Sequence, residues 1–427
     1  SVFLKSIAGV IFAPAGIWLI ATGFAEHPET FDLAVALTRF MFPYIIFMSL
    51  VAFAAAVLNT WKHFAIPAFT PVLLNVSFIV CILALTPFMT EPVWALAVAV
   101  IGGGVLQLGT QLSALKRLGV FPKMTSPAAA LRDSKVRQTL KLMLPAVVGV
   151  SVAPLSILIN TNIASRLSDG AVTWLSYADR LMEFPTAMLG VALGTVLLPS
   201  LASAFNRGEL ERYNGLLDRG LRLVVLLAVP AAVGLWFCAE LLAAVLFQGK
   251  NFTATDVLQT SVAIEGYAAG LLGLIGIKII APAFYARKDI KTPVKAALAS
   301  VVFVQTCNLV TVPQFAHAGL ALSVALGACF NALVLLSVLL KRGWFKPLSG
   351  WGLYFGRTAL AAAAMGAVLW WIGLQFDWAA MQAVWGRRLL LAALVIGAAA
   401  VTYFAVMAVF GWRAQELRSA VAERHKK

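Results

Sequence analysis

About twelve long apolar runs divide this chain of 427 residues. A helix needs roughly 18 to 20 apolar residues to cross about 30 Å of hydrocarbon, and each run is at least about that long. The runs therefore predict an all-α integral membrane protein, and their length excludes the shorter strands of a membrane barrel. The predicted spans are residues 2–24, 33–58, 68–88, 92–115, 136–167, 172–204, 217–247, 257–285, 294–312, 318–340, 353–374 and 389–410.

Composition and charge agree with a lipid environment. Hydrophobic residues make up 61% of the chain and charged residues 12%, whereas soluble domains are about half apolar and a quarter charged. The net charge of +15 could suggest a nucleic-acid partner, but the basic residues lie in short clusters between apolar runs. This distribution is typical of a membrane surface, so no nucleic-acid partner is expected.

The basic clusters alternate along the chain and predict its orientation. Under the positive-inside rule, the basic loops and the C-terminus face the cytoplasm. The opposite loops hold little positive charge, and the first of them is acidic. The basic set contains Lys62, Lys116, Arg117, Lys123, Arg132, Lys135, Arg137, Arg207, Arg212, Arg287, Lys288, Lys291, Lys341, Arg342, Lys346 and the tail at 413–427.

The cysteines and histidines do not form a metal-binding pattern. Cys81, Cys238, Cys307 and Cys329 lie inside predicted spans without a CxxC pair, and the four histidines are scattered through loops and the tail. Small buried thiols are the expected role of such cysteines. No metal site and no cofactor are predicted.

An internal repeat relates the two halves of the chain. In the first copy, residues 95–99 lie near the start of a span that is followed directly by Lys116 and Arg117. In the second copy, the similar residues 321–325 lie near the start of a span that is followed by Lys341 and Arg342, at an offset of about 225 (341 − 116). A second pair of loop motifs gives nearly the same offset. Both copies have the same orientation, so the repeat is parallel, an arrangement that places a transporter cavity between two halves.

The repeat also predicts the domains. Subtracting the offset from the first two spans of the second copy gives positions before residue 1, so two helices of the first copy are expected to be missing. We predict the remainder of an N-terminal lobe at 1–120, with four helices. A six-helix lobe follows at 121–346, and two additional helices with a basic tail occupy 347–427.

Three charges lie within five residues of the span 172–204. Asp179 and Glu183 share a helix face, and Arg180 can pair with Glu183. At 1.5 Å per residue they lie roughly 10 to 17 Å from the outer end of the helix, where an ionisable group costs at least about 2.5 to 3.5 kcal/mol. A water-filled cavity where the charges meet or gate a substrate is one interpretation, and a structural ion pair between helices is the other. Pro185 is expected to interrupt the helix just beyond them.

Other polar groups inside spans are weaker candidates. Glu265 is deep in its span, Arg39 lies near the outer end of another, and Lys278 is close enough to the cytoplasmic end to extend into water. Several amides are expected to form hydrogen bonds between helices. These amides are Asn75, Gln107, Gln111, Asn160, Asn162 and Asn308.

Four segments resemble the signature segments of the MurJ/MviN family. They are residues 59–67, 177–185, 189–200 and 289–294, and the likeness runs over nearly the whole chain. The family belongs to the multidrug/oligosaccharidyl-lipid/polysaccharide exporter superfamily. The resemblance implies two six-helix lobes and two added C-terminal helices, about 14 spans in the intact family, of which about twelve are present here.

The resemblance also implies a function. Such proteins move lipid II, the undecaprenyl-diphosphate-linked peptidoglycan precursor, to the outer leaflet of the bacterial inner membrane by alternating access. Arg180 would hold the diphosphate, and Asp179 and Glu183 would pair with arginines of the other lobe or with the substrate. The helices that begin near Leu353 and Leu389 would form a groove for the lipid tail. Membrane lipids and the cell-wall synthesis machinery are the implied partners.

Two alternatives to a lipid II flippase stay open at this point. Another exporter of the same superfamily, for a different polyprenyl-linked glycan or for drugs, would have the same fold. A membrane glycosyltransferase would need an acid on a sizeable outward loop, and the outward loops are short. Some relatives bind sodium through carboxylates, but here the corresponding helices offer Asn160, Asn162 and Asn308, so no sodium site is expected.

Overall fold

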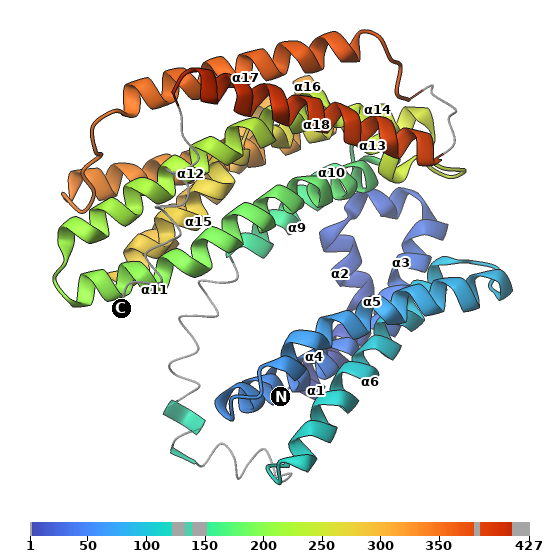
Figure 1. Ribbon diagram of the computed structural model, residues 1–427. Helices are drawn as coiled ribbons and strands as arrows, with labels where there is room; N and C mark the ends of the chain where they lie inside the picture. Colours follow the sequence, from blue (N-terminus) through green and yellow to red (C-terminus); the bar gives the residue numbers. More distant parts are fainter. Residues whose placement is uncertain (1, 122–132, 135, 139–151, 380–384, 412–427) are drawn as a thin grey trace. The chain divides into compact units, whose positions relative to one another are not determined.

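A computed structural model describes residues 2–121, 133–134, 136–138, 152–379 and 385–411. Every regular element in these residues is a helix, which confirms the predicted all-α class (Figure 1). The chain divides into two compact units, one of residues 1–148 and 161–166, the other of residues 149–160 and 167–427. The predicted domain boundaries at residues 121 and 347 stay predictions.

Some predicted features lie outside the described residues. These are most of the basic loop with Lys123, Arg132 and Lys135, residues 139–151 of the span 136–167, and the basic tail after residue 411. The orientation of the C-terminus therefore stays a prediction.

Unit 1 is a bundle in which α5 and α4 pack against α6. Two predicted amides connect these helices. Gln107 donates a hydrogen bond to the Thr70 carbonyl oxygen at 3.2 Å, and Gln111 donates one to the Thr70 hydroxyl at 3.0 Å. The elements are α1 (Val2–Ile11), α2 (Ala13–Ile20), η1 (Thr22–Glu26), α3 (Pro28–Met41), α4 (Tyr44–Thr60), α5 (Ala65–Leu85), η2 (Thr86–Phe88) and α6 (Val93–Arg117).

Unit 2 contains the remaining helices, and α12, α14, α15 and α16 form its centre. α17 and α18 pack against each other, and α17 lies along α12. The elements are α9 (Val152–Ala164, whose last residues belong to unit 1), α10 (Ala171–Pro185), η3 (Thr186–Val191), α11 (Ala192–Asn206), α12 (Leu210–Phe237), α13 (Ala239–Phe247), α14 (Ala254–Ala268), α15 (Leu271–Ala286), α16 (Lys291–Lys341), α17 (Trp351–Gly373) and α18 (Trp385–Val409).

Helix α16 is a hairpin of two antiparallel halves. Its 51 residues would form a straight helix of about 76 Å, well beyond the roughly 40 to 45 Å of a whole bilayer. Ala316 breaks it with a φ of 49° and a ψ of −129°. Ser300 donates a hydrogen bond of 2.7 Å to the Gly327 carbonyl oxygen, and Phe303 stacks on Phe330. The two halves coincide with the predicted spans 294–312 and 318–340.

Glycines let α14 and α15 approach this hairpin at backbone distance. A Cβ atom at Gly270 would lie 2.3 Å from the Ala325 Cα atom, and one at Gly273 would lie 2.6 Å from the Cys329 nitrogen. Small residues at such crossings are typical of membrane helices, which gain stability from close packing because lipid gives no hydrophobic driving force between helices.

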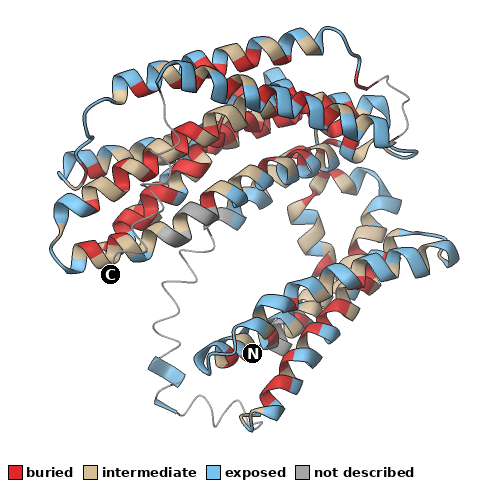
Figure 2. Cartoon of the chain, viewed as in Figure 1, coloured by how far each residue is buried: buried red, intermediate tan, exposed pale blue. Residues whose placement is uncertain are grey.

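The outer faces of the helices are strongly apolar. Figure 2 shows buried residues facing neighbouring helices and exposed ones along the outer faces, and Leu83, Leu309 and Val409 are among the most exposed side chains. Seven helices in the described residues are long and apolar enough to cross a membrane, or eight if the bent pair α14 and α15 counts as one span. The count of about twelve stays a prediction, since several predicted spans fall on broken helices.

Candidate functional site

The three predicted charges lie together on α10 and point away from the core of unit 2. Asp179, Arg180 and Glu183 are all exposed in this structure. The Arg180 guanidinium is 3.8 Å from the Glu183 carboxylate, with side-chain exposures of 78% and 64%. The charges also interact electrostatically along the helix, Asp179 with both Glu183 and Arg180. We call these residues the α10 triad.

The opposite face of α10 explains this orientation. Ala171, Leu175, Ala178 and Met182 are buried, and their spacing of four, three and four residues places them on one side of the helix. This apolar side packs against α14, so the triad is directed outward from unit 2. The expected pairing of Arg180 with Glu183 is confirmed, as an exposed contact within one helix.

The helix changes its winding just after the triad. α10 ends at Pro185 and continues as a π-helical turn, η3. Proline lacks a backbone N–H, so it removes one bond of the helical ladder. At the next residue, the Thr186 backbone N–H and hydroxyl both donate to the Met182 carbonyl oxygen, the hydroxyl at 2.9 Å. The interruption expected at Pro185 is therefore present, and π-helical turns are frequent at functional sites.

Lys278 lies on α15 against this irregular segment. A Cβ atom at Gly190 would be 2.8 Å from the Lys278 Cγ atom, and one at Gly194 would be 3.1 Å from the Lys278 carbonyl oxygen. The glycines thus make room for the lysine and its backbone. Lys278 remains exposed, so unit 2 carries a second basic group beside the segment that continues from the α10 triad.

Glu265 is not part of this arrangement. It lies half-buried on α14 and interacts electrostatically with Glu240 of α13, whose carboxylate accepts a hydrogen bond from the Ala379 backbone at 2.9 Å. Tyr267, two residues further along α14, is the residue that interacts with Asp179. Two helical residues turn by about 200°, so Glu265 and Tyr267 point to different sides of α14.

Arg39 belongs to unit 1. It lies exposed in the last turn of α3, where its Nε atom donates a hydrogen bond of 3.3 Å to the Val10 carbonyl oxygen. This bond holds the base of the side chain against α1. Within unit 2, the structure therefore brings together three of the six predicted site residues, places Lys278 beside the continuation of their helix, and places Glu265 on a different side of α14 from Tyr267.

The predicted amide contacts include a half-buried cluster between α9 and α16. The Asn160 Oδ1 atom accepts hydrogen bonds from Asn308 at 3.0 Å and from Gln305 at 3.3 Å. Asn308 is 4% exposed, and its own Oδ1 atom has no partner within the described residues. In that part of the chain no group of three or more metal-ligating His, Cys, Asp or Glu side chains occurs.

A second charged cluster was not singled out from the sequence. Asp218 on α12 is 1% exposed and accepts hydrogen bonds from Arg222 at 2.8 Å, from the Trp351 indole at 2.7 Å and from the Leu348 backbone at 3.0 Å. It fixes the segment before α17 to the start of α12. The i, i+4 spacing of Asp218 and Arg222 was a visible signal, but it is also typical of exposed pairs.

Comparisons with known proteins agree with one another. A family model described as lipid II flippase MurJ matches residues 1–387. The lipid II flippase MurJ of Burkholderia cenocepacia is 47% identical over 409 residues, which cover 96% of this chain and 79% of that protein. The probable lipid II flippase MurJ of Haemophilus influenzae is 38% identical over 382 residues, covering 86% and 74%.

A solved structure has the same fold. It is lipid II flippase MurJ in an inward closed conformation, and it matches with a TM-score of 0.76 over 96% of this chain and 80% of that one, at 22% sequence identity.

Proposed function

Because this chain belongs to the MurJ family of lipid II flippases, we propose that it carries lipid II from the cytoplasmic to the outer leaflet of the bacterial inner membrane. It is a transporter, so no covalent step is required of its residues. The alternative substrates considered above, other polyprenyl-linked glycans or drugs, have no specific observation in their favour.

The exposed α10 triad carries the proposal for the site. Arg180 and Glu183 are mostly exposed, and an exposed pair of this kind contributes less than about 1 kcal/mol to stability, so both charged groups are available to a ligand. Lipid II contains a diphosphate, and a guanidinium binds such a group through two parallel charge-assisted hydrogen bonds. Arg180 therefore holds the diphosphate. Asp179 and Glu183 keep Arg180 oriented and release it when the substrate binds.

Two further basic residues are proposed to interact with the anionic substrate. Lys278 adds a point charge next to η3, where a flexible ammonium can follow the headgroup as it moves. Arg39 supplies positive charge from unit 1. Glu265 lies on another side of α14, so it does not contact the headgroup together with Arg180.

The transport mechanism proposed here is alternating access. The π-helical turn η3 gives the α10–α11 segment a point at which it can bend, because its backbone hydrogen bonds are already irregular. α17 and α18 guide the lipid tail, the C-terminus is cytoplasmic, and the cell-wall synthesis machinery supplies or receives the substrate.

Replacement of Arg180 by alanine tests the site. The variant would be expressed as the full-length protein in a strain depleted of its own flippase, and growth and lipid II translocation in vesicles would be measured. We expect both to fall to the depleted background while membrane insertion is retained, because the Arg180 side chain is 78% exposed.

Arg207→Ala is the matched control. Arg207 is also exposed and pairs with a nearby glutamate, Glu209, at 3.9 Å, but it lies in the loop between α11 and α12. This variant should complement fully. Normal complementation by Arg180→Ala would overturn the assignment of the site, and transport of an organic cation in place of lipid II would overturn the assignment of the substrate.

A further inference from the structure

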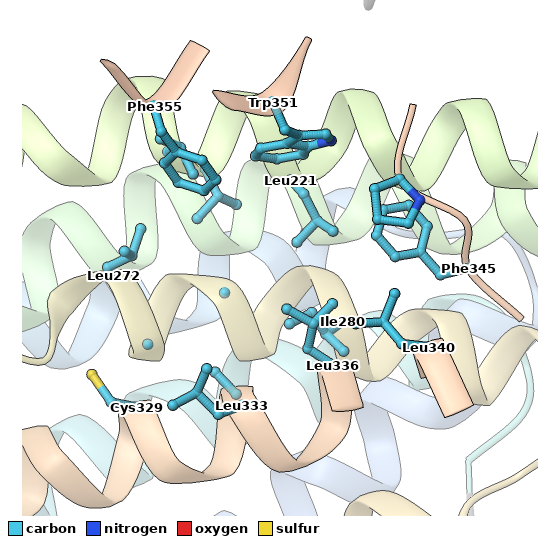
Figure 3. A pocket seen from close by; sticks show the side chains of 16 residues that line it. Leu221, Leu272, Ile280, Cys329, Leu333, Leu336, Leu340, Phe345, Trp351 and Phe355 are labelled. Carbon is cyan, nitrogen blue, oxygen red and sulfur yellow. The ribbon is translucent and has the colours of Figure 1, made fainter. Parts of the chain in front are cut away.

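Unit 2 contains a long apolar pocket away from the α10 triad. Its volume is about 560 Å³, and it lies between α12, α15, α16 and the start of α17. Figure 3 shows Leu272 and Cys329 at one end and Leu340 and Phe345 at the other. The lining residues are apolar, and the one indole N–H among them, of Trp351, is already bonded to Asp218. The pocket therefore suits a hydrocarbon chain.

The length of the pocket matches one leaflet of a bilayer. Along α16 it extends from Cys329 to Leu340, eleven residues or about 16 Å at 1.5 Å per residue. Half of the roughly 30 Å hydrocarbon thickness is about 15 Å. A chain lying in this pocket would thus reach from one headgroup region to the middle of the membrane.

The pocket opens on the outer surface of unit 2. Leu333 of α16 and Phe355 of α17, which lie on its two long edges, are 62% and 50% exposed. Gly276 also lines the pocket, and the nearest atom to an added Cβ there would be the Ala332 Cβ atom at 3.8 Å. A side chain added at Gly276 would therefore begin in ordinary contact with α16.

One end of the pocket is basic. Leu340 is followed directly by Lys341, and Phe345 by Lys346, and both lysines are exposed. Among the residues that the structure describes, neither ammonium group has an ion-pair partner. Arg342, which follows Lys341, is paired with Asp289, and Arg222, which also donates to the Ser349 carbonyl oxygen, is paired with Asp218. Two lysines are thus free to bind an anion at the level of the headgroups.

We infer that this pocket binds an acyl chain of an anionic glycerophospholipid from the leaflet next to the basic loops. Lys341 and Lys346 contact the phosphate-bearing headgroup, and the chain lies against α15 and α16. The lipid fills the space between α17 and the central helices. This inference concerns membrane lipid rather than the transported substrate, and it does not depend on flippase activity.

Photo-crosslinking tests the inference directly. The full-length protein would be placed in nanodiscs with phosphatidylglycerol that carries a diazirine in one acyl chain, and labelled peptides would be identified by mass spectrometry. We expect labels on the segments 329–340 and 351–355. Gly276→Leu places a side chain in the pocket and should reduce these labels roughly tenfold.

Two matched variants separate the pocket from general effects. Gly397→Leu makes the same change on α18, where nothing lies within 4 Å of an added Cβ, and should leave the labels unchanged. Lys341→Gln together with Lys346→Gln should remove the preference for phosphatidylglycerol over the same phosphatidylcholine probe. Lys250→Gln, in an outer loop, should not.

Three results would overturn the inference. One is equal labelling by the phosphatidylcholine probe in the unmodified protein. Another is labelling that persists in Gly276→Leu. The third is displacement of the probe by undecaprenyl phosphate at lower concentration than by unlabelled phosphatidylglycerol, which would assign the pocket to a polyprenyl tail.

Discussion

Arg342, at the end of α16, donates a hydrogen bond of 2.7 Å to the Asp289 carboxylate in the loop before α16. The same carboxylate accepts hydrogen bonds from the Thr292 backbone and hydroxyl. The two open ends of the hairpin are therefore joined. This gives a structural role to the segment 289–294, one of those that resemble family signatures.

The first prediction concerns the pH dependence of this junction. Burial raises the pKa of Asp289, but the hydrogen bonds from Thr292 and Arg342 outweigh it and leave the pKa below its ordinary value. A lowered pKa in the folded state gives stability that is present above the unfolded value of about 3.9 and is lost as the pH falls below it.

We therefore expect the unfolding midpoint of the protein in detergent to fall as the pH decreases from 6 towards about 3, and to fall less in Asp289→Asn. At neutral pH that variant should be less stable by about 1 kcal/mol, since Arg342 is partly exposed. Asp32→Asn, an exposed carboxylate in unit 1, should keep the pH profile of the unmodified protein. The same profile in Asp289→Asn would contradict the prediction.

The second prediction concerns the buried cluster at Asp218. Asp218 is buried while Arg222 is 26% exposed, so the main cost of removing Asp218 is the loss of the acceptor for the Trp351 and Leu348 N–H groups, about 2 to 5 kcal/mol in total. Asp218→Ala should therefore lower the free energy of unfolding by about that amount in SDS titration. Glu209→Ala removes an exposed pair with Arg212 near the start of the same helix and should cost less than about 1 kcal/mol. Equal effects of the two changes would contradict the structure.

The all-α class and the α10 triad could be predicted from sequence because the bilayer imposes both. Lipid requires long apolar helices, so the runs are visible without a structure. Charges inside such a run are costly, so Asp179, Arg180 and Glu183 stand out. The hairpin in α16 was also predictable, because residues 313–317 separate two apolar runs.

Contacts between distant residues could not be predicted in the same way. The Asp218 cluster depends on Trp351, which is 133 residues away along the chain. In the sequence alone, Asp218 and Arg222 near the end of a span are as typical of an exposed ion pair as of a buried one. Depth in the membrane does not reveal the direction of a side chain. Glu265 was deep in its span, yet it points to a different side of α14 from Tyr267, which meets the α10 triad.

The third prediction concerns close packing at Gly270. Alanine in place of glycine usually stabilises a helix by roughly 0.5 to 1 kcal/mol, and Gly397→Ala on the open face of α18 should do so. In Gly270→Ala the new Cβ atom would lie 2.3 Å from the Ala325 Cα atom, so the helices must separate, at a cost of about 1 to 3 kcal/mol. In thermal unfolding, the midpoint temperature should rise in Gly397→Ala and fall in Gly270→Ala. Stabilisation by Gly270→Ala would contradict the backbone contact.

The fourth prediction separates a structural ion pair from a substrate site on α10. Exchanging the two residues, Arg180→Glu with Glu183→Arg, keeps the i, i+3 pair while moving the positive charge by three residues. The exposed pair is worth less than about 1 kcal/mol, so the exchanged protein should insert and unfold as the unmodified protein does. We expect it to fail in complementation, because a bidentate contact with diphosphate depends on the position of the guanidinium. The matched exchange of Glu209 and Arg212 should remain active. Full activity of the α10 exchange would mean that the pair only stabilises the helix, and the proposed role of Arg180 would then be wrong.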